Sequence, residues 1–300
     1  MASLDSTKGI KAPSVYCIVV NWNGWQDTIA CLTSLAAQDY PRLGVIVIDN
    51  GSTDGSNSKI REAHPWITLI ETGKNLGFSG GSNVGIKLAV QQGAEYVWLL
   101  NNDTTMPPDT ASKMVRAAQA HPNAGAVGSV LYLMDNPQQV QAWGGGSLNL
   151  WLGYVSQFKQ PTTFGPNAFL TGASMLLPRH ICEEVGILYE GFFMYCDDSD
   201  LCLRIRRAGY GLVVASDTAI LHREGGSSVR RSATIDAYAT TSMLRLLQRH
   251  APVPVVSALI FLFLRVANRV RKGEWRNLMA VARGVRVFIQ EIEVPYNERA

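Results

Sequence analysis

The sequence is poor in features that mark several common classes of protein. Its net charge is only +3 over 300 residues, and no stretch interleaves basic with aromatic residues, so we expect no nucleic-acid partner. The G-x-G-x-x-G pattern of nicotinamide-dependent oxidoreductases does not follow the first apolar run. Residues 21–24, after that run, also lack the lysine or arginine that a nucleotidyltransferase would normally place there. These absences argue against both classes of enzyme.

Cysteine pairs and secretory features are also missing. The five cysteines form no C-x-x-C pair, and Cys17 and Cys202 lie in an apolar and a helical segment, which favours buried thiols in a reducing compartment. Residues 1–14 contain no apolar core for a secretory signal. We therefore predict a cytoplasmic protein with a flexible N-terminus over residues 1–13.

No apolar run is long enough to span a bilayer. The longest, residues 251–264, is interrupted by Pro252 and Pro254 and falls short of the roughly 20 residues required. The segment 234–300 is interpreted as a helical C-terminal extension. It could attach peripherally to the cytoplasmic face of a membrane, form a helical cap on the rest of the chain, or form a homodimer interface. Its basic residues fit amphipathic helices: Arg265, Arg269, Arg271, Lys272, Arg276, Arg283 and Arg286.

Strand and helix patterns alternate in the first half. Runs rich in β-branched residues predict buried strands at residues 15–20, 45–49, 67–71 and 96–100. Helices are expected over 25–36 and over 86–91, the second after a glycine-rich loop at 73–85. Repeated β-α-β units predict an α/β fold, a Rossmann-like, doubly wound, mostly parallel sheet flanked by helices.

The second half is more mixed. Strands are expected at 125–133, 169–177 and 211–215, and a helix at 198–208 that ends before Gly209. From residue 235 the pattern is helical, with Gly273 as a break. Parallel sheets bind ligands beyond the carboxyl ends of their strands, and the polar clusters of the first half all lie where a predicted strand ends.

Two of these clusters could hold a nucleotide. Asp49 and Asn50 could bond to a nucleobase or a ribose, although a polar turn with a helix cap explains the same residues. The glycines between Asn75 and Asn83 would let the backbone approach a diphosphate, although such turns are common without any ligand.

Two further positions could hold a metal ion. Asp103 follows a buried strand, which is how a divalent cation is usually presented to a diphosphate, or it could merely begin a turn with Asn102. His222 could complete such a site or play a structural role.

Three carboxylates lie within four residues, at Asp197, Asp198 and Asp200. Mutual repulsion raises the pKa of at least one of them, which suits a general base. The alternative is an acidic first turn of a helix with Asp197 as its cap.

The order of the motifs resembles the family-2 glycosyltransferases with the GT-A fold, and within them the rhamnosyltransferase-like branch. The resemblance covers about residues 14 to 230 and implies a catalytic domain over 14–233. It is carried by VVNWNG, VIVIDNGSTDGS, NLGFSGGSNVGI, YVWLLNNDT, FLTGASMLLPR, GFFMYCDDSDLCLRIRRAGY and LHREGGSS.

By position, the resemblance implies three sets of site residues. Asp198 would be the catalytic base, supported by Asp197 and Asp200. Asp103 and His222 would hold Mg²⁺ or Mn²⁺. The nucleotide-sugar site would comprise Val20, Asn21, Trp22, Asn23, Asp49, Asn50, Asn75, Gly81, Asn83, Asn101 and Asn102.

The resemblance implies an inverting transferase that moves a sugar from a dTDP- or UDP-linked donor, by a metal-assisted single displacement. The acceptor would be a hydroxyl of a saccharide or a lipid-linked glycan, and the branch favours dTDP-rhamnose as donor. Two positions depart from the family pattern. Asn50 stands where many relatives have an aspartate, and Asn101 replaces the first acid of the metal-binding D-x-D motif.

Acceptor contacts are expected from residues 143–169 and from the C-terminal extension. Aromatic residues there could stack on sugar rings or be ordinary packing: Trp143, Trp151, Tyr154 and Phe158. The main alternative to an enzyme is a catalytically silent protein that binds a sugar nucleotide or a lipid-linked glycan. The crowded carboxylates favour the enzyme, because a binding module has no use for them.

Overall fold

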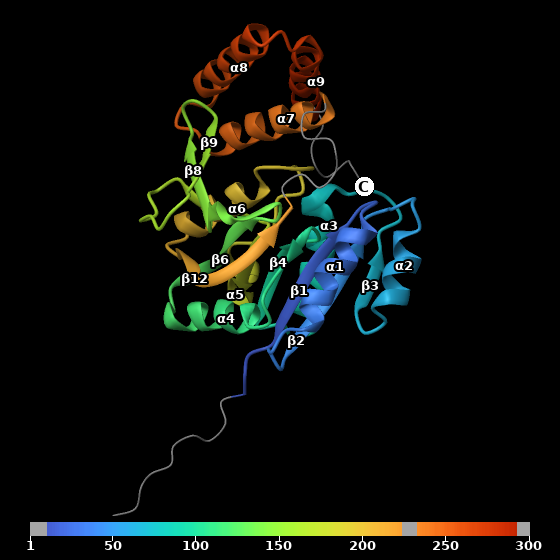
Figure 1. Ribbon diagram of the computed structural model, residues 1–300. Coiled ribbons are helices and arrows are strands. Elements are labelled where there is room, and N and C mark those ends of the chain that lie inside the picture. Colours follow the sequence, from blue (N-terminus) through green and yellow to red (C-terminus); the bar gives the residue numbers. More distant parts are fainter. Residues whose placement is uncertain (1–10, 224–232, 293–300) are drawn as a thin grey trace, which may run out of the picture.

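The computed structural model describes residues 11–223 and 233–292, and one large sheet lies at its centre (Figure 1). Its strands are β1 (Val15–Asn21), β2 (Leu43–Asp49), β3 (Thr68–Glu71), β4 (Tyr96–Asn101), β5 (Thr104–Thr105), β6 (Ala124–Leu133), β7 (Asn136–Trp143), β11 (Ser174–Pro178) and β12 (Gly211–His222). They lie in the order β3-β2-β1-β4-β11-β6-β12-β5, and β7 pairs with β6. The end of the LHREGGSS motif, residues 224–228, and the N-terminal residues 1–10 lie outside the described part.

The sheet is mixed but mostly parallel, as predicted. β1 pairs in parallel with both β2 and β4, β2 with β3, and β12 with β6. β11 enters between β4 and β6 and is antiparallel to both. The carboxyl ends of β1, β2 and β4 therefore meet at one edge of the sheet.

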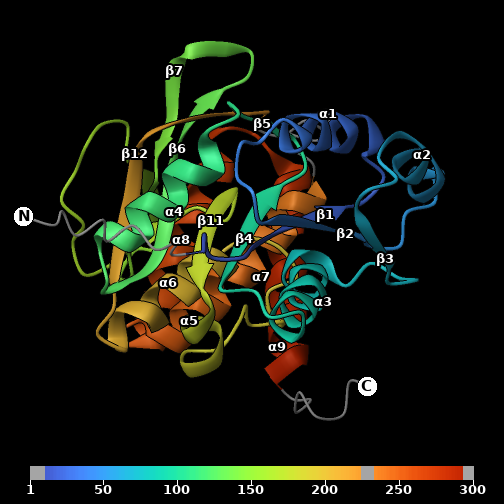
Figure 2. The same ribbon diagram turned by 90° about the horizontal axis from the view of Figure 1, so that it is seen from below.

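Helices cover both faces of the sheet (Figure 2). One face carries α1 (Trp25–Ala36), α2 (Ser56–Ala63) and α4 (Thr110–Ala120), and the other carries α3 (Gly77–Gln91), α5 (Arg179–Glu184) and α6 (Asp197–Arg207). Side chains of β1 alternate between the two resulting cores. Cys17 and Val19 pack toward α1, and Ile18 packs toward α3, which is the period-2 pattern of a strand buried on both faces.

The glycine-rich segment at 73–85 is mostly helix rather than the loop we expected, because α3 already begins at Gly77. A Cβ at Gly85 would collide with the side chain of Ile18, so the helix packs directly against β1. Gly77 has φ +74° and lies against the backbone of Phe193. These glycines serve close packing, which outweighs their low helix propensity.

The prediction of a single strand over residues 169–177 is also wrong. The structure divides it into β10 (Ala168–Leu170) and β11, separated by residues 171–173. β10 joins β8 (Gly145–Asn149) and β9 (Tyr154–Gln157) in a small antiparallel sheet, in the order β10-β8-β9. β12 is longer than expected, since it continues through an irregularity after Ala215 to His222.

Three helices form the C-terminal region: α7 (Ala233–His250), α8 (Pro254–Arg271) and α9 (Trp275–Ile292). Gly273 has φ +66° and separates α8 from α9, as predicted. α7 lies against the rest of the chain, where the Ser242 hydroxyl donates to the carbonyl of Met194 at 2.6 Å. α8 lies beside the β8–β9 hairpin (Figure 1). Across residues 11–223 and 233–292, each helix is too short or too polar to span a bilayer.

Candidate active site

The chain turns sharply just before the acidic cluster. Tyr195 and Cys196 have φ angles of +70° and +64°, a left-handed backbone conformation that residues other than glycine rarely adopt. Cys196 is the N-cap of α6, and no side chain caps this helix. The predicted acidic first turn is therefore confirmed, whereas the prediction that Asp197 is its cap is wrong. Strain of this kind is typical of functional sites, where surrounding structure holds it in place.

Asp198 lies half-buried in the first turn of α6. One carboxylate oxygen accepts the N–H of Gly172 at 3.0 Å, and the other accepts the N–H of Ser199 at 2.6 Å. Burial raises the pKa of Asp198, and these hydrogen bonds oppose that rise by favouring the charged form. The break between β10 and β11 thus supplies a donor that orients the carboxylate.

Asp197 is more deeply buried, and its Oδ2 has no hydrogen-bond partner among the described residues. Burial raises its pKa, and the neighbouring charge of Asp198 adds to that rise. A carboxyl group with a raised pKa is a stronger base, once ionised, than an ordinary carboxylate, which suits a general base.

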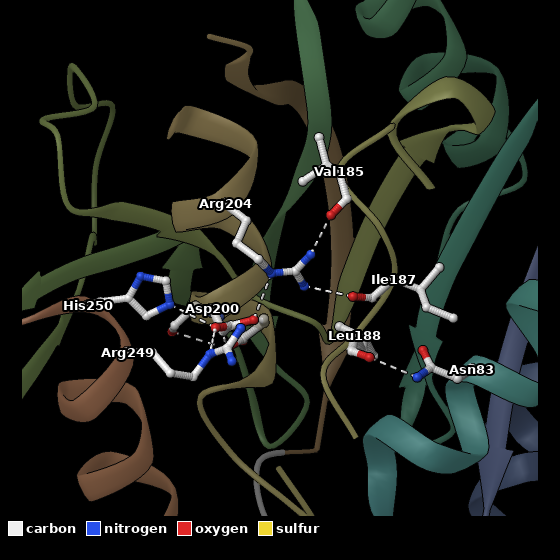
Figure 3. Close-up of polar contacts among 10 residues, drawn as sticks. Asn83, Val185, Ile187, Leu188, Asp200, Arg204, Arg249 and His250 are labelled. Carbon is white, nitrogen blue, oxygen red and sulfur yellow. Dashed lines mark hydrogen bonds and ion pairs between the residues drawn. The ribbon is translucent and has the colours of Figure 1, made fainter. Parts of the chain in front are cut away.

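Asp200 has the opposite environment (Figure 3). It is fully buried, and one oxygen accepts hydrogen bonds from Arg249 and His250 of α7, each at 2.7 Å. Arg204 bonds to the other oxygen at 2.9 Å and also to the carbonyls of Val185 and Ile187. Burial alone would raise the pKa of Asp200, but the hydrogen bond from His250 and the charges of Arg204 and Arg249 lower it to about 2. Asp200 therefore anchors α7 to α6.

The candidate metal ligands lie together. Nε2 of His222 is 3.2 Å from Oδ1 of Asp103 and 3.2 Å from the side-chain nitrogen of Asn101. Nδ1 of His222 lies 2.8 Å from Oε1 of Gln141. Because that amide oxygen can only accept, it favours a proton on Nδ1 and leaves the lone pair of Nε2 facing Asp103. Gln141 was missed from the sequence, since nothing local links it to His222.

These side chains fit a divalent cation as a partial set of ligands. A carboxylate and an imidazole are a suitable pair for Mn²⁺, and Mg²⁺ also accepts one carboxylate with the remaining ligands from phosphate and water. Within residues 11–223 and 233–292 no group of three or more His, Cys, Asp or Glu side chains could hold a metal. Oxygens of a bound diphosphate would have to complete the coordination.

One cavity of about 700 Å³ joins the candidate base to the candidate metal site. Asp197, Asp198, Asn101 and His222 all line it. Its walls also include residues of the small sheet, of α7 and of α8: Tyr154, Val155, Phe169, Ala239, Met243, Phe261 and Arg265. Residues from the range 143–169 thus reach the cavity, and of the four aromatics named there Tyr154 lines it. Their predicted contact with an acceptor stays a prediction.

Asn21 and Asp49 lie side by side at the ends of β1 and β2. The Asn21 amide donates to Asp49 Oδ1 at 3.1 Å, and the Ser52 hydroxyl donates to the same oxygen. Both side chains are buried. Asn23, with φ +51°, accepts the N–H of Thr53 at 2.8 Å and so joins the two strand-end loops. Trp22 is exposed, at 54%.

Asn50 and Asn75 hold the loop before α3. The Asn50 amide donates to Asn75 Oδ1 at 3.2 Å and to the Gly77 carbonyl at 3.0 Å, and its oxygen accepts the N–H of Leu76 at 3.0 Å. Asn50 is 2% exposed, so its present contacts shape the loop rather than offer free polar groups. The predicted role in base recognition stays a prediction.

The remaining predicted residues have structural partners. Asn83 donates to the carbonyl of Leu188 at 2.8 Å (Figure 3). A Cβ at Gly81 would lie 3.1 Å from Val20, so these two residues pack together. Asn102 donates to the Thr28 hydroxyl at 2.9 Å.

The arrangement of the sheet and its helices is that of the GT-A glycosyltransferases. A solved mannosyltransferase from Pyrobaculum calidifontis, in complex with GDP-Man and Mn²⁺, superimposes with a TM-score of 0.58 at 21% identity, covering 93% of this chain and 75% of that one. GalNAc-T7, solved with UDP, GalNAc and Mn²⁺, superimposes with a TM-score of 0.62 at 12% identity, covering 80% and 48%. These similarities establish the predicted fold.

The sequence comparisons identify the family. The model of glycosyl transferase family 2 matches residues 16–186, and the chain belongs to that family. The N-acetylglucosaminyl-diphospho-decaprenol L-rhamnosyltransferase of Mycobacterium tuberculosis is 28% identical over 73% of this chain and 80% of its own length. The dTDP-rhamnosyl transferase RfbF of Shigella flexneri is 23% identical over 91% of this chain and 96% of its own length. The predictions of a rhamnosyltransferase-like branch and of a glycosyltransferase enzyme are confirmed.

Proposed function

We propose that this glycosyltransferase inverts the anomeric configuration of a sugar taken from a dTDP- or UDP-linked donor, with dTDP-rhamnose favoured, and places it on a saccharide or lipid-linked glycan. The observation that carries the proposal is the shared cavity, which brings Asp198 to the same space as Asn101 and His222. A base and a diphosphate site on one cavity are what a single displacement requires. Both rhamnosyltransferase relatives support the choice of donor.

In the proposed reaction, a hydroxyl oxygen of the acceptor forms a bond to the anomeric carbon. The bond from that carbon to the donor phosphate breaks, and its electron pair leaves with the nucleoside diphosphate. Asp198 takes the hydroxyl proton as the new bond forms. Its raised pKa suits this step, because a very weakly basic carboxylate would gain little from accepting the proton.

Asp103 and His222 would hold Mg²⁺ or Mn²⁺. A bound divalent cation would supply positive charge that stabilises the leaving diphosphate. The 3.2 Å separation of Asp103 Oδ1 and His222 Nε2 places two ligand atoms together, and Gln141 orients the imidazole. We infer that His222→Ala weakens metal binding and transfer together, whereas Gln141→Ala weakens both by a smaller factor.

A panel of dTDP-, UDP- and GDP-sugars, incubated with purified protein and Mn²⁺, tests the proposal. We expect slow release of nucleoside diphosphate from one donor, lost on addition of EDTA. With an acceptor mixture containing a lipid-linked saccharide, the product should have the inverted anomeric configuration by NMR. Binding of a donor without release, with or without acceptors, would favour the catalytically silent alternative.

We further propose that α8 and α9 attach peripherally to an anionic membrane. Large apolar side chains of both helices point to solvent, with Leu259 63%, Phe263 72% and Trp275 63% exposed. Exposed basic residues lie on the same helices or at the end of α8: Arg271, Lys272, Arg276, Arg283 and Arg286. Apolar and basic groups together are typical of helices that lie in the interface of an anionic bilayer.

Co-sedimentation with vesicles tests this attachment. We expect wild-type protein to pellet with vesicles containing phosphatidylglycerol, and the double variant Leu259→Glu/Phe263→Glu to stay in the supernatant. Trp66→Glu is the matched control, because Trp66 is 48% exposed but lies outside the C-terminal helices. If the double variant instead converted a dimer to a monomer and vesicles bound neither protein, the surface would be a homodimer interface.

A further inference from the structure

Arg265 is the single lysine or arginine among the described residues that line the active-site cavity. The cavity otherwise presents the acidic pair Asp197 and Asp198 and a largely apolar wall. A guanidinium placed there needs an explanation, because removing a charge from water is costly unless a partner offsets it.

The ion pair with Asp236 satisfies the hydrogen-bonding groups of the Arg265 guanidinium only in part. Its Nη2 donates to Asp236 Oδ1, and that same oxygen also accepts Nη2 of Arg269 at 2.8 Å. Nε of Arg265 is buried and has no hydrogen-bond partner in the described structure, and the same holds for Nε of Arg269 and Oδ2 of Asp236. Arg269 has a second carboxylate, Glu274, at 2.6 Å. Both arginines thus share one oxygen of Asp236 and each keeps an unpaired Nε, but among the described residues Arg265 has no second carboxylate and, of the two, it alone lines the cavity. A cavity-lining guanidinium whose charge is only partly offset is suited to bind an anion.

Arg265 belongs to the side of the cavity away from the strand ends. It comes from α8, whereas Asn101 and His222 of the diphosphate side come from β4 and β12. One turn earlier on α8, Phe261 contacts the β8–β9 turn, where a Cβ at Gly153 would lie 2.7 Å from its ring. This places Arg265 on the wall shared with the hairpin.

An apolar path leads from Arg265 to the exterior. Phe261, Tyr154 and Val155 line the cavity, and Tyr154 is 64% exposed. The guanidinium carbon of Arg265 lies 5.4 Å from the centre of the Phe261 ring. Next to them on the hairpin, Leu152 is 40% exposed and Val155 is 36% exposed. A charge at the inner end and apolar side chains at the outer end match an anionic amphiphile.

We propose that Arg265 binds a phosphate or diphosphate of the acceptor, whose apolar tail leaves the cavity past Phe261 and Tyr154. The acceptor would then be a sugar joined through this anionic group to a lipid. The inference rests on the proposed function, since it places the acceptor sugar beside Asp198. Asp236 acts as a positioning residue that holds the guanidinium in the wall.

Binding of farnesyl diphosphate to the full chain, measured by calorimetry, tests this inference. The donor site is first saturated with dTDP or UDP and Mn²⁺, so that the probe cannot occupy it. We expect Arg265→Met to lower the affinity for farnesyl diphosphate at least tenfold, and Arg265→Lys to retain part of that affinity. Arg269→Met is the matched control, because it also removes an arginine from Asp236 but leaves the lining of the cavity intact.

Each outcome decides the assignment. Equal affinity in wild type and Arg265→Met, or no binding to wild type, would overturn it. Weaker binding of dTDP or UDP in Arg265→Met would assign the guanidinium to the donor instead. Dihexanoylphosphatidylglycerol separates the two lipid sources, since binding as tight as that of farnesyl diphosphate would point to a membrane phospholipid. Because no turnover is measured, a failed donor panel leaves this result intact, and the reverse also holds.

Discussion

The carboxylates in the first turn of α6 lie in two sharply different electrostatic environments. Asp197 and Asp198 line the cavity and have raised pKa values, whereas Asp200 is buried among three basic side chains and has a pKa of about 2. The partners of Asp200 on α7 come from about fifty residues further along the chain. Carboxylates that are neighbours in sequence thus divide into a reactive pair and a structural anchor, and tertiary contacts decide which is which.

The largest effect should follow loss of the reactive carboxylate. Asp198→Asn keeps the shape of the side chain but cannot accept the hydroxyl proton, so transfer should fall by about 10²–10⁴-fold. Affinity for the nucleoside diphosphate should change less than about twofold, by calorimetry. Ser199→Ala removes a hydroxyl that bonds to Asp198 at 3.1 Å and should reduce transfer only slightly.

Asp200→Asn should instead reduce stability. It leaves Arg204 and Arg249 without their carboxylate in a buried site, which costs about 3–5 kcal/mol. Urea unfolding followed by circular dichroism measures this loss. Transfer per folded molecule should remain close to wild type, and a loss comparable to that of Asp198→Asn would contradict the division of roles.

Lowering the pH should remove the contribution of Asp200 to the free energy of unfolding. Its pKa is about 2 in the folded chain and about 3.9 in an unfolded one. A lowered pKa stabilises the fold at pH values above the unfolded value, and the contribution is lost as pH falls toward 2, about 2–3 kcal/mol in all. Unfolding free energies of wild type and Asp200→Asn should therefore converge between pH 4 and pH 2. Parallel curves would show that the pKa of Asp200 is the same in the folded and the unfolded chain.

Asp197→Asn should have the smallest effect. It should stabilise the fold, whereas Asp200→Asn destabilises it. Because burial raises the pKa of Asp197, ionising it opposes folding at neutral pH, where the unfolded chain holds it charged. The amide removes that cost and should raise the melting temperature by about 2–4 °C at this chain length. A lower melting temperature would mean that the charged form has a partner at this site.

The sheet and the acidic helix were predictable because their signals are local. Runs of β-branched residues located β1, β2 and β4, and the spacing before Gly209 located α6. The start of α3 was misplaced, because its glycines are required by close contacts, of Gly85 with Ile18 and of Gly77 with Phe193, and not by helix propensity. Tertiary packing outweighs local preference at such positions.

The lining of the site was only partly predictable. Asp198 and His222 stand in recognisable motifs, but Gln141 and Arg265 reach the site only through the fold. His250 had no local feature that suggested a role, and it bonds to Asp200 across the interface of α6 and α7. Partners of this kind depend on contacts between distant segments, which a single sequence does not reveal.

The pH dependence of kcat/KM, measured for wild type and for Asp198→Asn, tests the central assignment most directly. Asp198 must be unprotonated to act as the base, so wild-type activity should fall as pH is lowered through its raised pKa, and Asp200→Asn should keep that fall. The residual activity of Asp198→Asn should lack it. The same acid limb in Asp198→Asn would contradict the account, because another group would then be accepting the proton.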